Sequence, residues 1–236
     1  METDPLIALE TAVRLCEILL GLALAQQSVE HLAMPACDRR LFALRLLLSV
    51  LLVAGGWPTA VLGILLLTST WILARCDGPY NGGSDRVAVL MQICLLAVHL
   101  CRDLNAPPRW QEAAFGYLAI QIVLSYFMAG WVKVVNAEWR RGQALVDVFA
   151  FSAYPQSESL RGWAQWPRLM WVMGWAVMLF ELIFPLTLLR FDTLIAALVL
   201  AAFFHIANAL LFGLNRFVWV WLASYPSLLW LQARVF

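Results

Sequence analysis

The sequence predicts an all-α fold, a polytopic bundle of about eight transmembrane helices (about seven to nine), and three observations support it. Of the 236 residues, 63% are hydrophobic and only 13% are charged, whereas soluble domains are about half apolar and a quarter charged. A membrane-spanning helix needs about 20 apolar residues, so this chain has room for about eight. Eight apolar runs lie between charged residues, prolines or glycines, at residues 6–27, 41–55, 57–75, 84–102, 112–133, 168–189, 191–213 and 216–235.

The connections between these runs contain residues that end helices. Residues 55–58, Gly-Gly-Trp-Pro, predict a tight turn between two antiparallel helices, because proline fixes its own φ and disfavours helix at the preceding residue. In the long connection 134–167, the apolar stretch 144–151 predicts a short interfacial or re-entrant helix near residues 140–155. No internal repeat is visible, so a transporter built from duplicated halves has no support, and we treat residues 1–236 as a single integral membrane domain.

The charge and cysteine content restrict the partners. A net charge of +1 gives no reason to expect nucleic-acid binding, and the partner that the composition indicates is membrane lipid. No two cysteines form a CxxC pair, and the three histidines lie in separate helices without carboxylates at ligand spacing, so we expect no metal. The first run lacks the features of a cleaved signal peptide. We therefore predict a multi-pass integral membrane protein, which in a bacterium would reside in the cytoplasmic (inner) membrane.

Charged residues inside the apolar runs are the main functional clue, because each costs about 3 kcal/mol or more at lipid depth and therefore faces a bundle interior or a cavity. In the first run, Glu10, Arg14 and Glu17 are spaced by four and three residues, which places them on one helix face. A structural ion network between helices is the interpretation we favour for this stripe. A functional acid–base stripe is the alternative.

The fifth run contains a second stripe, in which Tyr126, Gly130 and Lys133 are again spaced by four and three residues. Lys133 is the only lysine of the chain. Unlike arginine, a buried lysine can release its proton when it is removed from water, which makes Lys133 a candidate general base. A lysine at a helix end that extends to the membrane interface explains the same position equally well.

Three further polar groups complete the candidate set. His99 follows Gln92 by seven residues in the fourth run, and His205 precedes Asn208 by three in the seventh, so each pair shares a helix face. Such pairs suit hydrogen bonding to a carbonyl or quinone-like ligand, although a lone intramembrane histidine more often serves packing. Glu181 is another buried acid in the sixth run, and we expect it near the site.

Four segments carry a resemblance to a known family. Residues 126–133, Tyr-Phe-Met-Ala-Gly-Trp-Val-Lys, followed by Trp139 and Gly142, resemble the YFxAGxxK…W…G signature of the vitamin K-dependent gamma-glutamyl carboxylases and of their bacterial relatives, the HTTM (horizontally transferred transmembrane) domain proteins. Residues 81–85, Asn-Gly-Gly-Ser-Asp, are similar to the asparagine-containing turn of that family. Residues 180–185 resemble its FELxFP segment, and residues 204–224 resemble its FHxxN…LF…G…LAS stretch. The resemblance covers roughly residues 70–230.

The resemblance implies a mechanism. Lys133 matches the lysine that deprotonates reduced vitamin K in the carboxylases, after which the quinol anion reacts with oxygen to form a strong base that removes a γ-proton of a peptide glutamate before carbon dioxide is added. His205 would act beside Lys133. The residues expected to bind substrate or cofactor are Asn208, Tyr126, Gly130, Asn81, Glu181, His99 and Gln92. The cofactor implied is a reduced, vitamin K-like quinone.

The chain departs from the carboxylases at three points. It has Asn81-Gly82 where the animal enzyme has an Asn-His pair, it contains no counterpart of the large lumenal domain, and an extra residue separates Lys133 from Trp139. Two classes of function follow: a quinol-dependent carboxylase or oxidoreductase that modifies a peptide or lipid, or a non-enzymatic maturation or export factor for a secreted peptide, like the sporulation-delaying protein accessory factors. A small transporter is a third, disfavoured reading.

Overall fold

The computed structural model describes residues 8–33, 38–75, 83–151 and 158–235. By its contacts the chain divides into two compact units, one of Met1–Ile120 with Arg216–Val235 (unit 1) and one of Gln121–Asn215 (unit 2). Each unit is described separately below. That the whole chain forms a single domain stays a prediction.

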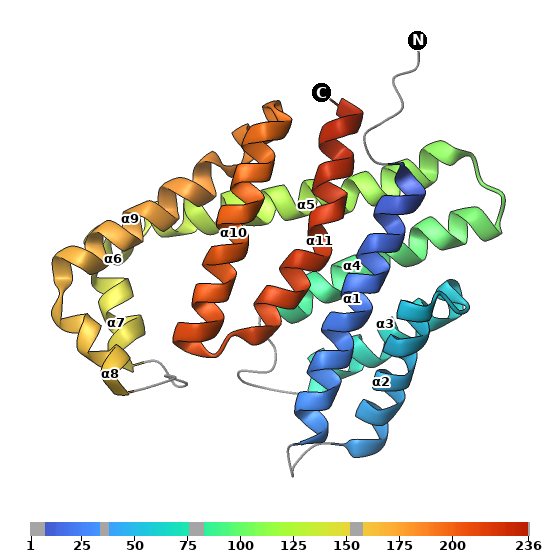
Figure 1. The fold of residues 1–236 in the computed structure, drawn as a ribbon, viewed down its shortest axis with the longest axis horizontal. Coiled ribbons are helices and arrows are strands. Elements are labelled where there is room, and N and C mark those ends of the chain that lie inside the picture. The colour runs from blue at the N-terminus through green and yellow to red at the C-terminus, as the bar shows by residue number, and fades with distance from the viewer. Residues whose placement is uncertain (1–7, 34–37, 76–82, 152–157, 236) are drawn as a thin grey trace. The chain divides into compact units, whose positions relative to one another are not determined.

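Unit 1 contains helices α1 (Leu9–Leu32), α2 (Arg39–Ala54), α3 (Pro58–Arg75), α4 (Gly83–Asp103), the first part of α5 (Pro108–Val135) and α11 (Asn215–Val235). Helix α1 packs against α2 and α4, and α3 packs against the same two helices, as Figure 1 shows. The predicted turn between α2 and α3 is confirmed, because Gly55 ends α2 in the left-handed conformation with φ 81° and α3 begins at Pro58.

Unit 2 contains the second part of α5, the short helices α6 (Ala137–Arg140), α7 (Gln143–Phe151) and α8 (Glu158–Arg161), and the 3₁₀ helix η1 (Gly162–Gln165). The long helix α9 (Pro167–Ile183), the 3₁₀ helix η2 (Phe184–Leu189) and α10 (Phe191–Phe212) follow. Helix α7 lies where the sequence predicts a short helix near residues 140–155. Helix α9 changes to 3₁₀ geometry at Phe184, next to Pro185, because proline lacks the N–H that would continue the α-helical bonding.

All eight apolar runs form helices, which confirms the all-α fold class. Six of these segments are long and apolar enough to cross a membrane, namely α1, α3, α4, α5, α9 with η2, and α10. Helix α2 has 16 residues, about 24 Å of helix, which is shorter than the roughly 30 Å hydrocarbon core. Helix α11 is the second predicted span that is not among these six. It contains the polar residues Ser224, Ser227 and Gln232, which lower its hydropathy.

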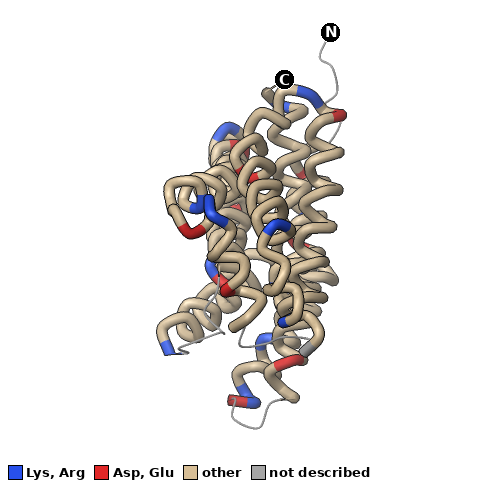
Figure 2. The backbone as a smooth tube through the Cα atoms, turned by 90° about the vertical axis from the view of Figure 1, so that its left-hand side faces the viewer, with Lys and Arg blue, Asp and Glu red and all other residues tan. Residues whose placement is uncertain are grey.

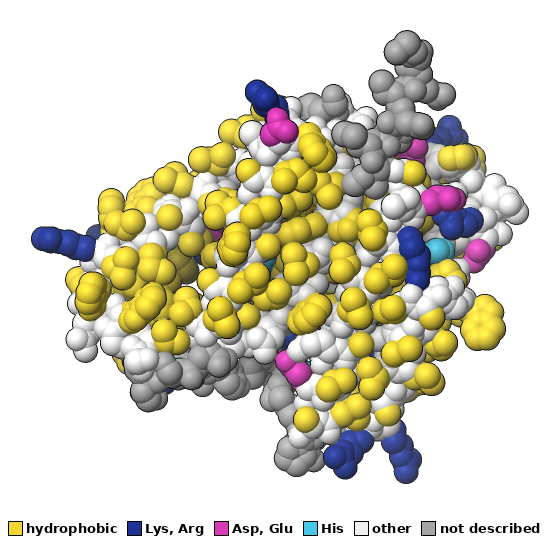
Figure 3. All heavy atoms as spheres, viewed as in Figure 1, with side chains coloured by type: hydrophobic (Ala, Val, Ile, Leu, Met, Phe, Trp, Pro, Cys, Tyr) yellow, Lys and Arg dark blue, Asp and Glu magenta, His cyan; other side chains and the backbone are white. Residues whose placement is uncertain are grey.

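The surface supports a lipid environment. Large apolar side chains are largely exposed on the long helices, for example Leu67 on α3 and Phe203 and Leu210 on α10, each with at least 65% of its surface exposed. Hydrophobic side chains cover much of the face in Figure 3. Charged residues lie mainly toward helix ends (Figure 2), and the charged residues of α3 and α10 are at their ends. Contiguous exposed apolar surface of this kind indicates an integral membrane protein.

Candidate functional site

The α5 stripe of Tyr126, Gly130 and Lys133 packs closely against α9 within unit 2. A Cβ atom added at Gly130 would lie 2.9 Å from Glu181 Cβ and 2.9 Å from the backbone nitrogen of Leu182. Real Cβ atoms do not approach other atoms so closely, so the two helices could not keep this separation with any residue larger than glycine at position 130. Gly130 therefore sets how near Lys133, one turn further along α5, comes to α9.

Lys133 and Glu181 form an ion pair between α5 and α9. The Lys133 Nζ atom lies 2.6 Å from both Glu181 Oε1 and Oε2, and the two side chains are only 19% and 5% exposed. The amine also lies 5.4 Å from the centre of the Trp139 ring, which is within the range of a cation–π interaction. The lysine is thus held between a carboxylate and an indole ring, and it does not extend freely to the surface as a helix-end lysine would.

Tyr126 and His205 form a second polar contact, between α5 and α10. The Tyr126 hydroxyl lies 3.0 Å from His205 Nε2, and these residues are 3% and 4% exposed. The Tyr126 ring stacks on Phe184 at 4.0 Å between ring centres and meets the edge of Phe180 at 6.1 Å. Because Glu181 lies between Phe180 and Phe184, one segment of α9 and η2 contacts both the tyrosine and the lysine of the α5 stripe.

The Lys133–Glu181 and Tyr126–His205 contacts can hold and transfer a proton in an environment that is largely shielded from water. The ion pair can exist as ammonium and carboxylate or as neutral amine and carboxylic acid, and a low local dielectric narrows the energy difference between the two forms. Tyr126 and His205 can each donate or accept a hydrogen bond. A bound molecule with hydroxyl or carbonyl oxygens would find partners of both kinds here.

The family comparison agrees with the residues that build this site. The model of the HTTM domain matches residues 101–232, more than half of the chain. The chain belongs to the HTTM domain family. The match includes the α5 stripe, the α9–η2 segment and the His205 region. It begins at residue 101 and therefore excludes Asn81, whereas the resemblance described above covers roughly residues 70–230. Comparisons with curated proteins and with solved structures find no match.

The remaining candidates of the HTTM-family site lie as follows. Asn208 is half-buried on α10, one turn beyond His205. Asn81 lies outside the described residues. Gln92 is in unit 1, where its Oε1 accepts a hydrogen bond from Ser69 at 3.0 Å and its Nε2 donates to the Ala88 carbonyl at 3.0 Å. That Asn81, Gln92 and Asn208 take part in the HTTM site stays a prediction.

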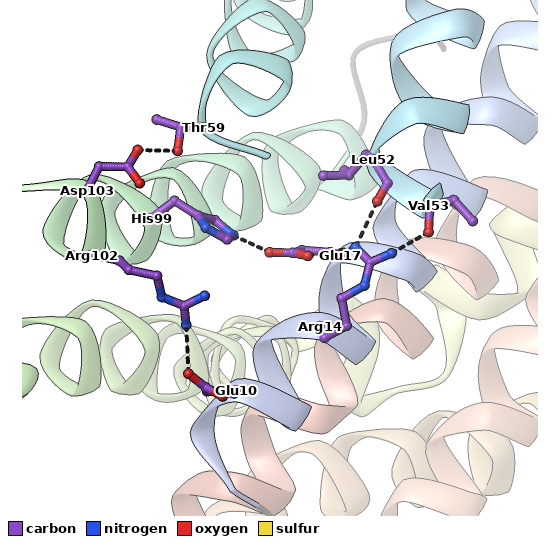
Figure 4. Close-up of polar contacts among 9 residues, drawn as sticks. All are labelled: Glu10, Arg14, Glu17, Leu52, Val53, Thr59, His99, Arg102 and Asp103. Atoms are coloured by element: carbon purple, nitrogen blue, oxygen red, sulfur yellow. Dashed lines mark hydrogen bonds and ion pairs between the residues drawn. The ribbon is translucent and has the colours of Figure 1, made fainter. Parts of the chain in front are cut away.

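His99 is also in unit 1, where it joins the charged stripe of α1 (Figure 4). Its Nε2 atom hydrogen-bonds to Oε1 of Glu17, which is 3% exposed, and Arg14 approaches Glu17 Oε2 at 2.8 Å. Arg14 additionally donates to the Leu52 carbonyl at 2.9 Å and to the Val53 carbonyl. These carbonyls belong to the last turn of α2, where few backbone N–H groups remain to satisfy them; the Leu52 carbonyl also accepts from the N–H of Gly55 at 3.1 Å. The geometry supports the structural ion network that the spacing favoured.

Two features of the site were not identified from the sequence. The sequence indicates Trp139 as an interfacial anchor and as part of the family motif, but not its ring beside Lys133, and it does not indicate the packing of Phe180 and Phe184 around Tyr126. The signal for the second was present, since both phenylalanines belong to the FELxFP segment on either side of Glu181. Within the described part of the chain, no three His, Cys, Asp or Glu side chains are grouped so as to hold a metal ion.

Proposed function

We propose that this HTTM-family protein is a membrane enzyme of the carboxylase or oxidoreductase type, which uses a reduced, vitamin K-like quinone and modifies a peptide or lipid. Lys133 is its general base. The observation that carries the proposal is the enclosed contact of Lys133 with Glu181, next to the buried Tyr126–His205 pair and on the same segment of α9 and η2. The substrate class rests on the family resemblance.

The base is best described as the Lys133–Glu181 pair. The amine lies 2.6 Å from both carboxylate oxygens, so a proton can pass directly between the two groups. When that proton resides on Glu181, the neutral Nζ atom of Lys133 can accept a proton from an acidic hydroxyl of a bound molecule. The resulting ammonium is then stabilised by the adjacent Trp139 ring.

The side chains present fit a quinone. A quinone is a flat ring with two oxygens that act as acceptors when oxidised and as donors when reduced, and the site offers a hydroxyl, an imidazole and an amine together with the Phe180 and Phe184 rings. Tyr126 and His205 would hold such a group by hydrogen bonds, with Lys133 at the oxygen that loses a proton. The bound quinone would supply the acidic hydroxyl and the reducing equivalents.

The test compares Lys133→Arg and Glu181→Gln with the native chain. Each protein is purified in detergent and supplied with reduced naphthoquinone or ubiquinone, and oxygen consumption and quinone absorbance are followed. We expect both variants to lose activity, because arginine keeps the charge but cannot release its proton and the glutamine cannot hold one. Arg190→Gln, at a 74% exposed position of unit 2, is the matched control and should retain activity.

A non-enzymatic maturation or export factor is the alternative, and one observation favours it. The Lys133–Glu181 pair joins α5 to α9, and such a pair can serve packing alone. On that reading Lys133→Arg, which preserves the charge and the bidentate contact with a carboxylate, would leave the biological output unchanged. The native protein would then also consume no oxygen with any quinol.

A further inference from the structure

The two ends of unit 1 can be distinguished by the contacts between its helices. At one end, Gln27 of α1 donates to Asp85 of α4 at 2.7 Å, and Arg216 of α11 lies 3.4 Å from Glu30 of α1. The ring of His31 stacks on Phe42 of α2 at 4.2 Å between ring centres. The C-terminal end of α1 therefore meets the N-terminal ends of α2, α4 and α11. This end is called the basic end below.

The basic end carries an excess of positive charge. Its described charged residues are six arginines and three acids, Arg39, Arg40, Arg45, Arg75, Arg86 and Arg216 against Glu30, Asp38 and Asp85. At the opposite end of unit 1 the two signs balance, with Arg14, Arg102, Arg109 and Arg234 against Glu10, Glu17, Asp103 and Glu112. Positive charge gathers on the cytoplasmic side of membrane proteins, where anionic lipids are also enriched.

Arg45 is the unusual member of this set because it is buried and, among the described residues, has no ion-pair partner. Only 2% of its surface is exposed. Its Nε atom has no hydrogen-bond partner, and no carboxylate lies within ion-pair distance of its side chain among the residues that the structure describes. A guanidinium carries five N–H donors and never loses its charge in a protein, so leaving it buried and unpaired costs several kcal/mol. This arrangement indicates an acceptor from outside the chain.

The surroundings of Arg45 indicate what that acceptor is. Arg45 is six residues from the start of α2, about 9 Å along the axis, and a long basic side chain this near a helix end can reach the headgroup level of a membrane. Asp85 and Arg216 are the charged residues that act electrostatically on Arg45, and one oxygen of Asp85 is already bound by Gln27. Arg216, which also belongs to the basic end, is 14% exposed and lies nearer the surface than Arg45. The first turns of α4 and α11 add N–H groups that favour an anion.

We infer that the basic end of unit 1 binds the phosphate group of an anionic membrane lipid, with Arg45 as its buried ligand and Arg216 as its outer one. Two guanidinium groups suit a phosphate because each can offer paired N–H donors to two oxygens. This site lies in unit 1 and does not depend on the function proposed for Lys133.

The test measures the apparent melting midpoint of the full chain in detergent by tryptophan fluorescence, with phosphatidylglycerol, phosphatidylcholine or inorganic phosphate added at equal phosphate concentration. We expect phosphatidylglycerol to raise the midpoint in a saturable way and the other two to raise it much less. Arg45→Met should weaken the apparent affinity for phosphatidylglycerol by about tenfold or more. Arg40→Met, at an exposed position of the same helix, is the matched control: it removes one charge from the same end but no proposed ligand, and it should weaken the affinity much less than Arg45→Met.

A second variant keeps the proposal testable if Arg45→Met does not fold. Asp85→Asn removes the carboxylate that competes with the phosphate, and it should strengthen phosphatidylglycerol binding severalfold. If Asp85→Asn instead lowers the midpoint and leaves the lipid response unchanged, Asp85 is the partner of Arg45 and the proposal is overturned. An equal lipid response of the Arg45 and Arg40 variants also overturns it. A shift with inorganic phosphate as large as that with phosphatidylglycerol overturns the lipid as the source of the phosphate.

Discussion

Replacing Gly130 with alanine tests whether the contact between α5 and α9 holds the candidate site together. The added Cβ would lie 2.9 Å from Glu181 Cβ, 2.9 Å from the Leu182 nitrogen and 3.0 Å from Leu182 Cγ. One of these atoms belongs to the backbone, so a rotamer change of one side chain cannot relieve the overlap. The helices must separate by several tenths of an ångström, which lengthens the Lys133–Glu181 contact one turn away.

Overpacking of this kind costs about 1–3 kcal/mol. For a chain of this size, this corresponds to a fall of about 2–12 °C in the melting midpoint. The matched control is Gly63→Ala in the interior of α3, where a Cβ would meet no atom within 4 Å. There the gain in helix propensity should leave the midpoint unchanged or raise it, since alanine in a helix is favoured over glycine by up to about 1 kcal/mol.

The assay is thermal unfolding followed by tryptophan fluorescence in detergent, with quinol-dependent oxygen consumption as the second readout. We expect Gly130→Ala to lower both the midpoint and the activity, and Gly63→Ala to lower neither. If Gly130→Ala is as stable as Gly63→Ala and equally active, then α5 and α9 do not pack as described, and the Lys133–Glu181 pair loses its structural basis.

Three other predictions follow from single contacts. Tyr126→Phe keeps the stacking on Phe184 but removes the hydroxyl that contacts His205 at 3.0 Å, so it should lower the free energy of unfolding by about 1–3 kcal/mol, measured by thermal or denaturant unfolding. Glu17→Gln should destabilise the chain by about 1–3 kcal/mol in the same assay because it removes the buried carboxylate that Arg14 and His99 contact, whereas Glu10→Gln, whose side chain is 82% exposed, should change little. Arg234→Gln breaks an exposed pair with Glu112 at 3.1 Å and should cost less than about 1 kcal/mol.

The positions of the helices could be predicted from the sequence because helix formation in a membrane depends on local properties of the chain. Each apolar run satisfies its backbone polar groups internally only as a helix, and the run boundaries follow from residues with fixed conformational preferences. Pro58, Pro108 and Pro167 are the first residues of α3, α5 and α9, and Gly55 and Gly213 end α2 and α10 with positive φ. These signals lie within a few residues of the boundaries that they predict.

The partners of the charged residues could not be predicted in the same way. Helical spacing places Glu17 on a face of α1, but its contact with His99 joins residues 82 positions apart. The sequence likewise grouped Lys133 with His205, whereas the contacts within unit 2 pair Lys133 with Glu181 and His205 with Tyr126. The helix faces that pack together are determined by the angles at which helices cross and by close contacts such as the one at Gly130. The periodicity of residues within one helix predicts neither the crossing angles nor these contacts.

The two buried acids differ in a way that bears on function. Glu17 accepts contacts from both Arg14 and His99, and the arginine cannot release its proton, so this carboxylate is held in its charged form. Glu181 has one described partner, Lys133, whose amine can gain or lose a proton. Replacing that lysine with arginine would give Glu181 the kind of partner that Glu17 already has. Lys133→Arg should therefore preserve folding while abolishing proton transfer, and a stable but inactive variant is the result that an active base at this position requires.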